Sequence, residues 1–168
     1  MRLPLLLSFA VAPLALAGCA SKPTMHLNHA EISGVSLGLP PQLNVVLTCV
    51  VDVYNPNGYD VAIRAMRGTT VIGGRYTIPV DFRAPGDGVW LTANQTTQVR
   101  VPITVPVPTA IAIVRDAYFG PAIDYQLSGK ADVTATRTFQ LEKDDYSVND
   151  HGTITRDQIA ASLTGVRY

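Results

Sequence analysis

The sequence has 168 residues, of which 47% are hydrophobic and 15% charged, and its thirteen Lys and Arg balance thirteen Asp and Glu. A chain of this length and composition can form one domain with a substantial hydrophobic core. Proteins that bind duplex nucleic acid normally present a basic stripe, and this sequence contains no cluster of Lys and Arg. The composition therefore predicts a globular domain that does not bind nucleic acid.

The first eighteen residues are predicted to be a signal peptide and not part of the fold. Arg2 precedes an apolar run, Leu3 to Leu16, that ends in small residues and is too short to span a membrane. The tetrapeptide Leu16-Ala17-Gly18-Cys19 resembles the lipobox of bacterial lipoproteins. This resemblance implies cleavage before Cys19 and attachment of lipid to Cys19, which would anchor the chain to a membrane. The alternative is an ordinary signal peptide followed by an incidental cysteine.

The residues after Cys19 predict where the chain resides and how it is held there. Ala20 stands where an Asp would retain an enteric lipoprotein in the inner membrane. By resemblance to that sorting rule, the expected location is the outer membrane, facing the periplasm. Residues 19–29 are predicted to be the lipidated cysteine and a polar tether, and residues 30–168 the folded domain.

The folded domain is predicted to be organised around one long strand in Leu43–Tyr59, LNVVLTCVVDVYNPNGY. Its odd-numbered residues from Val45 to Val53 are all apolar, and such alternation marks a strand with one face turned to a core. Cys49 lies on this face and is predicted to be a small buried hydrophobe and not a reactive thiol. The Asn-Pro-Asn-Gly sequence at residues 55–58 predicts a tight turn that ends the strand.

Shorter strands are predicted on both sides of this one, separated by Gly and Pro signals. Gly68 is expected to end one of them, and Gly73-Gly74 to form a hairpin turn. Pro102 and Pro106 share one face of the strand at 97–107, which predicts an edge position. The remaining predicted strands are 30–39, 59–67, 75–82, 89–91 and 123–135, with 136–141 either continuing the last one or turning into another.

One internal helix is predicted at Thr109–Phe119. Ile111, Val114 and Tyr118 form an apolar stripe on it, and Gly120-Pro121 is a stop signal. The acidic segment Glu142–Asp150 is predicted to be a loop. A short C-terminal helix is predicted from Thr155 and Gln158, which fit a capping box, with Ile154 and Ile159 at the staple positions.

These elements predict an all-β, Ig- or fibronectin-III-like β-sandwich of about seven strands, with one crossover helix and a short C-terminal helix. Four motifs occur in a fixed order: Asn55-Pro56-Asn57, Gly73-Gly74, Val99-Arg100-Val101-Pro102-Ile103 and Tyr125 to Ala131. Together they resemble the group 2 late-embryogenesis-abundant family (LEA type 2), also called the water-stress and hypersensitive-response (WHy) domain. This resemblance covers roughly residues 30–143. It implies a fibronectin-III-like sandwich, an association with desiccation and stress protection, and no catalytic residues.

Several polar residues are considered as possible metal ligands or catalytic groups. His26 and His29 lie in the predicted tether, and a zinc site needs more fixed ligands than these supply. A calcium-loop alignment around Gly152 lacks carboxylates at its ligand positions, which would be Ser147, Asn149, His151 and Gln158. Asp144 and Asp145 are adjacent on a polar segment and are predicted to be solvated and not an acid–base pair. The sequence therefore predicts no metal, no cofactor, no small-molecule substrate and no enzymatic activity.

Three functional classes follow from the sequence. The first is a stress-protective lipoprotein of the cell envelope. The second is a structural or accessory module that binds another envelope protein, for instance by adding a strand at an exposed edge. The third, an enzyme, has no supporting constellation of residues.

Overall fold

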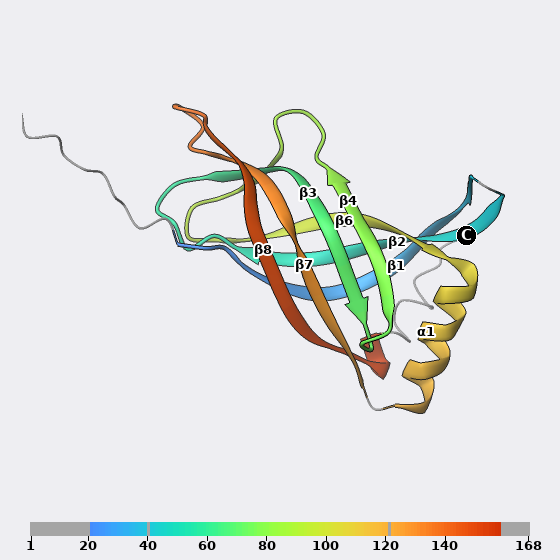
Figure 1. Cartoon of the computed structure of the whole chain (residues 1–168). Coiled ribbons are helices and arrows are strands. Elements are labelled where there is room, and N and C mark those ends of the chain that lie inside the picture. The colour runs from blue at the N-terminus through green and yellow to red at the C-terminus, as the bar shows by residue number, and fades with distance from the viewer. Residues whose placement is uncertain (1–20, 40, 121, 159–168) are drawn as a thin grey trace, which may run out of the picture.

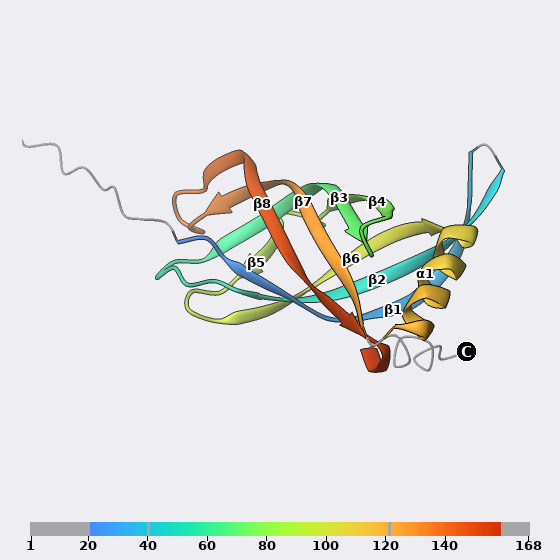
Figure 2. The same cartoon turned by 60° about the horizontal axis from the view of Figure 1, so that its bottom comes forward.

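A computed structural model describes residues 21–39, 41–120 and 122–158. Over this part of the chain, eight strands and a 13-residue helix form two sheets packed face to face (Figures 1 and 2). This confirms the predicted all-β sandwich with a crossover helix. The signal peptide, Cys19 and Ile159 lie outside the described residues. The elements are β1 (Thr24–Gly38), β2 (Gln42–Tyr54), β3 (Val61–Ile72), β4 (Tyr76–Arg83), β5 (Val89–Leu91), β6 (Thr96–Pro106), α1 (Val107–Phe119), β7 (Ala122–Ala135) and β8 (Leu141–Thr155).

All strand pairs in the two sheets are antiparallel. The first sheet has the order β1-β2-β6, so the predicted central strand lies in the middle and the proline-containing β6 lies at an edge, as predicted. The second sheet has the order β4-β3-β7-β8, and β5 pairs with one end of β3. On one side of the sandwich β4 packs along β6, whereas β1 and β8 on the other side touch over only a short stretch. Helix α1 connects the sheets at one end (Figure 1).

The core lies between the sheets near the end opposite α1. Val53 of β2 belongs to it, which confirms the predicted inner face at that end of the strand. On the outer face Val50 is also buried, at 1% exposure. It lies opposite Arg100 of β6, whose guanidinium pairs with Glu31 of β1 at 2.7 Å, so this ion pair bridges the two neighbours of β2. The central core residues are Val53, Val80, Phe82, Leu91, Val99 and Val101.

The predicted tether is wrong beyond Pro23, because β1 begins at Thr24. Thr24 lies opposite Tyr54, so the strand pairs with β2 as far as the last residue of β2. Met25 packs against the core, while His26 points outward. A polar composition misled the prediction, since only every second residue of an edge strand needs to be apolar.

The predicted break at Gly68 is also wrong, because β3 continues through it to Ile72. Gly68 lies directly opposite Gly129 of β7. A Cβ atom on Gly68 would lie 2.3 Å from the carbonyl oxygen of Ser128, and one on Gly129 would lie 2.5 Å from that of Arg67. These glycines therefore allow close approach of two backbones, which is a recognised role for glycine inside a strand. The predicted hairpin turn at Gly73-Gly74 is confirmed, with φ values of 57° and 65°.

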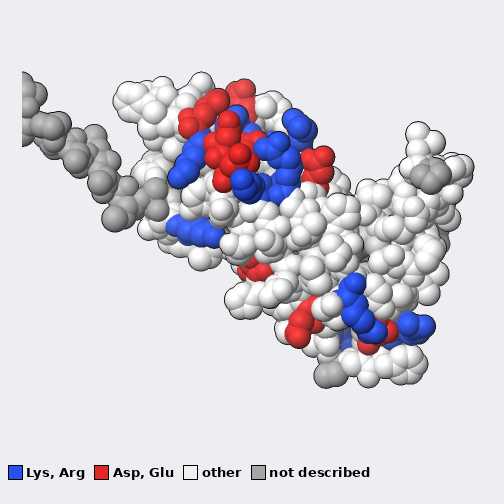
Figure 3. Space-filling view, in the orientation of Figure 1, with Lys and Arg blue, Asp and Glu red and all other residues white. Residues whose placement is uncertain are grey.

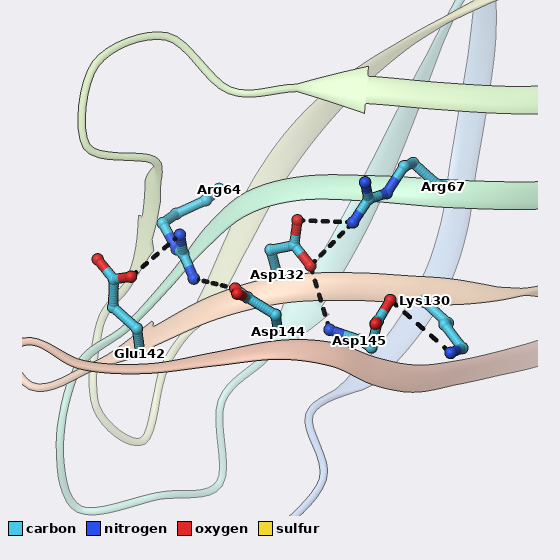
Figure 4. Close-up of polar contacts among 7 residues, drawn as sticks. All are labelled: Arg64, Arg67, Lys130, Asp132, Glu142, Asp144 and Asp145. Carbon is cyan, nitrogen blue, oxygen red and sulfur yellow. Dashed lines mark hydrogen bonds and ion pairs between the residues drawn. The ribbon is translucent and has the colours of Figure 1, made fainter.

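The prediction of a loop at Glu142–Asp150 is wrong. This acidic segment is part of the 15-residue strand β8. Figure 4 shows what holds its exposed side chains: Arg64 of β3 contacts Asp144 at 2.5 Å and Glu142 at 3.4 Å. The backbone amide of Asp145 donates to Asp132 of β7 at 3.1 Å. Glu142 and Asp144 of β8 are thus paired with a cation on β3, and Asp145 with Lys130 on β7, contacts between distant parts of the sequence that local composition cannot predict.

Helix α1 forms where predicted, but only Val114 of the predicted stripe contributes to the interior. Ile111 and Tyr118 of the predicted stripe are 63% and 67% exposed. Ala117 is buried instead, and Ala110 and Ile113 face the interior at the same spacing, one residue earlier in the chain. None of the described helices is long and apolar enough to cross a membrane.

The predicted capping box after β8 is confirmed. The backbone amide of Thr155 donates to Gln158 Oε1 at 2.9 Å, and the Gln158 amide donates to Thr155 Oγ1 at 3.4 Å. These reciprocal bonds satisfy backbone amides that have no partner within a helix, which is how a capping box stabilises the first turn.

Candidate functional site

An apolar cavity of about 270 Å³ lies between the two sheets. It extends from the central core to α1, and its walls come from both sheets and from the helix. Its surface is almost wholly apolar. A cavity of this size exceeds the roughly 150 Å³ engineered cavity that binds benzene. The side chains that form its walls include Leu27, Ile32, Val45, Leu47, Cys49, Val51, Val105, Ala110, Ile113, Ile123 and Leu127.

The cavity is elongated along β2, because alternate residues of that strand form one of its walls. Val45 and Val53, eight residues apart, both contribute. At a rise of about 3.3 Å per residue these two positions are about 26 Å apart. The sequence predicted this inner face but not the cavity. The composition did contain a sign of the cavity. The chain has only four Phe and one Trp, so few large side chains are present to fill the space between the sheets.

A polar cluster marks the side of the cavity where β1 approaches β8. The Tyr125 hydroxyl donates to Asp150 Oδ2 at 3.0 Å, and the backbone amide of Leu27 donates to the same hydroxyl. Burial, followed by the nearby Asp150 carboxylate, raises the pKa of Tyr125 to about 12. Gln158 Nε2 donates to the carbonyl oxygen of Asn28 at 3.1 Å and so links the end of β8 to β1. This cluster joins the two sheets on their otherwise open side.

Cys49 lies on the cavity wall as a free thiol. Burial raises its pKa to about 11, so very little thiolate is present near neutral pH. This supports the prediction that Cys49 is a small apolar residue and not a nucleophile.

A second buried polar cluster closes the other end of the sandwich, at the predicted Asn-Pro-Asn-Gly turn. Asn55 is 0% exposed and donates through Nδ2 to the carbonyl oxygens of Tyr59 and Leu91 at 2.9 and 3.1 Å. Asn57 makes two bonds to Ser21: its Oδ1 accepts from the Ser21 amide, and its Nδ2 donates to the Ser21 carbonyl, both at 2.9 Å. The turn thus fixes the chain that precedes β1.

Of the other residues named from the sequence, His29 contributes to the cavity wall, whereas His151, Asp144 and Asp145 lie along β8 outside it. His29 contacts Glu31 at 3.0 Å, and His151 lies in β8 on a strand and not in a calcium-binding loop. Asp144 binds Arg64, whereas Asp145 contacts Lys130 at 3.7 Å, so the two carboxylates do not act as a pair. Within residues 21–39, 41–120 and 122–158, no group of three or more His, Cys, Asp or Glu could hold a metal ion. Cys19 lies outside this part of the chain.

The projecting β1–β2 hairpin is an uncharged, apolar surface. The sequence from Ile32 to Val51, which includes the β1–β2 hairpin, has no charged residue. Figure 3 shows charged side chains gathered over β3, β7 and β8 and near α1, and none on the projecting hairpin. Leu37 and Leu39 of this hairpin are 80% and 98% exposed.

Comparison with known proteins identifies a related family. A sequence model described as "late embryogenesis abundant protein" (LEA_2) matches residues 50–145. No curated protein matches the chain. Similar solved structures include AT1g01470 from Arabidopsis thaliana, at 20% identity and a TM-score of 0.46 over 79% of this chain and 83% of that one. A candidate late embryogenesis abundant protein, At2g46140.1, has 20% identity and a TM-score of 0.45 over 84% of this chain and 75% of that one. A crystal structure from Archaeoglobus fulgidus has 9% identity and a TM-score of 0.38 over 80% and 95% of the two chains.

Proposed function

This chain belongs to the late embryogenesis abundant (LEA_2) family, and we propose that it is a non-catalytic, lipid-anchored protein of the bacterial cell envelope that protects against desiccation. The observation that carries the stress-related role is the family match, which spans residues 50–145. The observation that carries the anchoring is the lipobox Leu16-Ala17-Gly18-Cys19 at the end of an apolar signal segment. Ala20 after the lipobox favours the outer membrane, with the domain in the periplasm.

The geometry of the first described residues is consistent with attachment at Cys19. Ser21, two residues later, is held by both hydrogen bonds to Asn57. Two residues can span at most about 7 Å. An acylated Cys19 would therefore keep the turn at residues 55–58 close to the membrane surface. The far end of β1 and the β1–β2 hairpin would point away from it (Figure 1).

Metabolic labelling with palmitate, followed by membrane fractionation, tests the anchoring. Wild type and Cys49→Ala should take up label and sediment with the outer membrane, whereas Cys19→Ala should take up none. Cys49→Ala is the matched control, because Cys19 and Cys49 are the two cysteines of the chain. Unlabelled wild-type protein in the soluble periplasmic fraction would refute the anchor.

Survival after drying tests the protective role separately. A strain that lacks the gene should recover poorly after desiccation, and wild type should restore recovery. Cys19→Ala should restore it less well if protection acts at the membrane. Equal survival of the deletion strain and its parent would contradict a protective role.

A second candidate function is that of an accessory module for another envelope protein, favoured by the exposed apolar hairpin. Single exposed apolar side chains are common, but a charge-free hairpin with several of them is typical of an interaction surface. Addition of a strand at β6 is a less suitable mode, because Pro102 has no amide hydrogen to donate and β4 packs along β6. Cross-linking in intact cells, with Leu37→Ser and Leu39→Ser as the test and Ser36→Ala as the control, distinguishes this role. A discrete cross-linked partner that disappears only in the Leu variants would favour it over protection alone.

A further inference from the structure

We infer that the cavity between the two sheets binds one alkyl chain of a membrane lipid. The chemistry of its walls is the first argument. Val, Ile, Leu and Ala side chains from both sheets and from α1 form most of its walls, together with Met25, Met66 and Phe82, and the surface that they expose is almost wholly apolar. Such walls favour a ligand without polar groups along its length, because an unpaired polar group in this environment is costly.

The shape of the cavity restricts the ligand further. It follows β2 from Val53 to Val45, a distance of about 26 Å, while its volume is only about 270 Å³. The wall residues thus follow the strand for most of its length, so the cavity is elongated along β2. An unbranched chain matches this elongated shape, whereas a compact fused ring system of the same volume does not.

Water and peptide are poor occupants for physical reasons. A buried water needs two to four polar partners, and the middle of this cavity offers almost none. A helix with its side chains is about 10–12 Å wide, which exceeds the room between two sheets stacked about 10 Å apart once their side chains are present. An extended peptide would leave its backbone amides and carbonyls unpaired. An alkyl chain brings no such groups.

The polar cluster at one side of the cavity suits the head group of the same lipid. Tyr125 and Asp150 lie on the cavity wall, beside the approach of β1 to β8. A chain inserted from this side would leave its head group next to the Asp150 carboxylate. This arrangement favours a head group that carries an amine over one that is purely anionic.

This inference does not depend on the proposed function. The cavity is formed by residues of the folded domain, and it would bind an alkyl chain whether or not Cys19 is acylated. For this reason the binding experiment uses the full chain with Cys19→Ala, in which no acyl group can be attached at that residue. Loss of the anchor and loss of alkyl binding are then separate results.

Displacement of a fluorescent reporter, dansyl-undecanoate, tests the inference. 1-Palmitoyl-lysophosphatidylethanolamine should displace the reporter saturably, with one site per chain. Glycerophosphoethanolamine, which has the same head group and no alkyl chain, should not. Absence of displacement by the palmitoyl lipid, or equal displacement by both compounds, would overturn the proposal.

Two substitutions on adjacent residues of β2 provide the structural control. Cys49→Phe fills the cavity and should weaken displacement about tenfold or more, equivalent to at least about 1.4 kcal/mol. Thr48→Phe adds the same ring on the opposite face and should leave the affinity unchanged. If Cys49→Phe fails to fold, Cys49→Met is the variant to measure. Equal affinity in the Cys49 and Thr48 variants would contradict binding in the cavity.

A further variant examines the chain's own C-terminal segment as an occupant. In it Ser replaces Ile159, Leu163 and Val166, three apolar residues that follow the capping box. The affinity for the reporter should match that of the parent chain. Reporter binding that occurs only in this variant would show that the segment fills the cavity, and would overturn the proposal.

Discussion

Asn57 donates from Nδ2 to Asn55 Oδ1 at 2.9 Å, and the Asn57 backbone amide donates to the same oxygen at 3.1 Å. Both side chains are buried, at 7% and 0% exposure. Through this pair the end of β2 is joined to β5 on one side and to Ser21 on the other. The Asn-Pro-Asn turn is therefore a structural connector. The hydrogen bonds of the Asn55 side-chain amide go to other residues of the same domain, namely Asn57, Tyr59 and Leu91.

The first prediction concerns this connector. Asn55→Ala should destabilise the domain by about 2–4 kcal/mol, because two buried carbonyl groups and the Asn57 amide would lose their partners. Urea unfolding followed by the fluorescence of Trp90, the single tryptophan, measures the effect. Asn149→Ala, at an exposed position of β8, should change the free energy of unfolding by less than about 0.5 kcal/mol. Similar values for the two variants would contradict the structural role of Asn55.

The second prediction concerns the close contact of β3 with β7. Gly68→Ala and Gly129→Ala should each cost about 1–3 kcal/mol, because the added Cβ meets a backbone carbonyl and not a movable side chain. Gly34→Ala in β1 is the control, since a Cβ there would meet no atom within 4 Å. Thermal unfolding monitored by circular dichroism provides the measurement. Unchanged melting temperatures for the first two variants would show that the strands can separate without cost.

The third prediction concerns the thiol of Cys49, measured in the chain with Cys19→Ala so that one cysteine remains. Burial raises its pKa from 9.0 to about 11, which lowers the thiolate fraction at pH 8 roughly a hundredfold. Alkylation by iodoacetamide should therefore be slow in the folded protein and should accelerate only as the pH approaches 11. The denatured protein should react with a midpoint near pH 9. A folded-state midpoint near 9 would contradict the burial of this thiol.

The fourth prediction concerns pH and Asp60, a residue just before β3. A hydrogen bond from Arg137 at 2.8 Å, and then one from the Ala93 amide at 3.0 Å, hold the pKa of Asp60 below 3.8. Because the pKa of Asp60 is lower in the folded state than in the unfolded state, these bonds stabilise the fold fully at a pH above the unfolded pKa. The stabilisation is lost as the pH falls through the folded pKa and Asp60 is protonated.

Asp60→Asn should therefore lower the melting temperature at pH 7, and its difference from wild type should shrink below about pH 3.8. Asp87→Asn, in the exposed loop before β5, is the control and should have the melting temperature of wild type at pH 7. A difference between Asp60→Asn and wild type that stays constant down to pH 2 would contradict this role. Trp90 offers a local probe, because the Arg137 guanidinium lies 4.3 Å from its ring centroid.

Patterns that repeat within a few residues were sufficient to predict much of the fold. The alternation in β2, the prolines of β6, the glycine pair at residues 73 and 74 and the capping box at Thr155 each act through the local backbone, and each is confirmed. Local rules also predicted the helix, although its buried face is set by Ala117 and not by the larger Tyr118.

Other features were decided only by the tertiary structure, because they depend on partners far away in the sequence. Gly68 remains within a strand because Gly129 lies opposite it. The acidic segment is a strand because it pairs with β7 along its length, and Arg64 on β3 contacts two of its carboxylates, Glu142 and Asp144. The cavity arises in the same way, from two sheets whose inner residues are too small to meet across the gap beside α1. The sequence by itself determined which residues alternate and where the chain turns, since those are properties of the backbone. Only the packing of the sheets determined which close contacts form and what space is left between them.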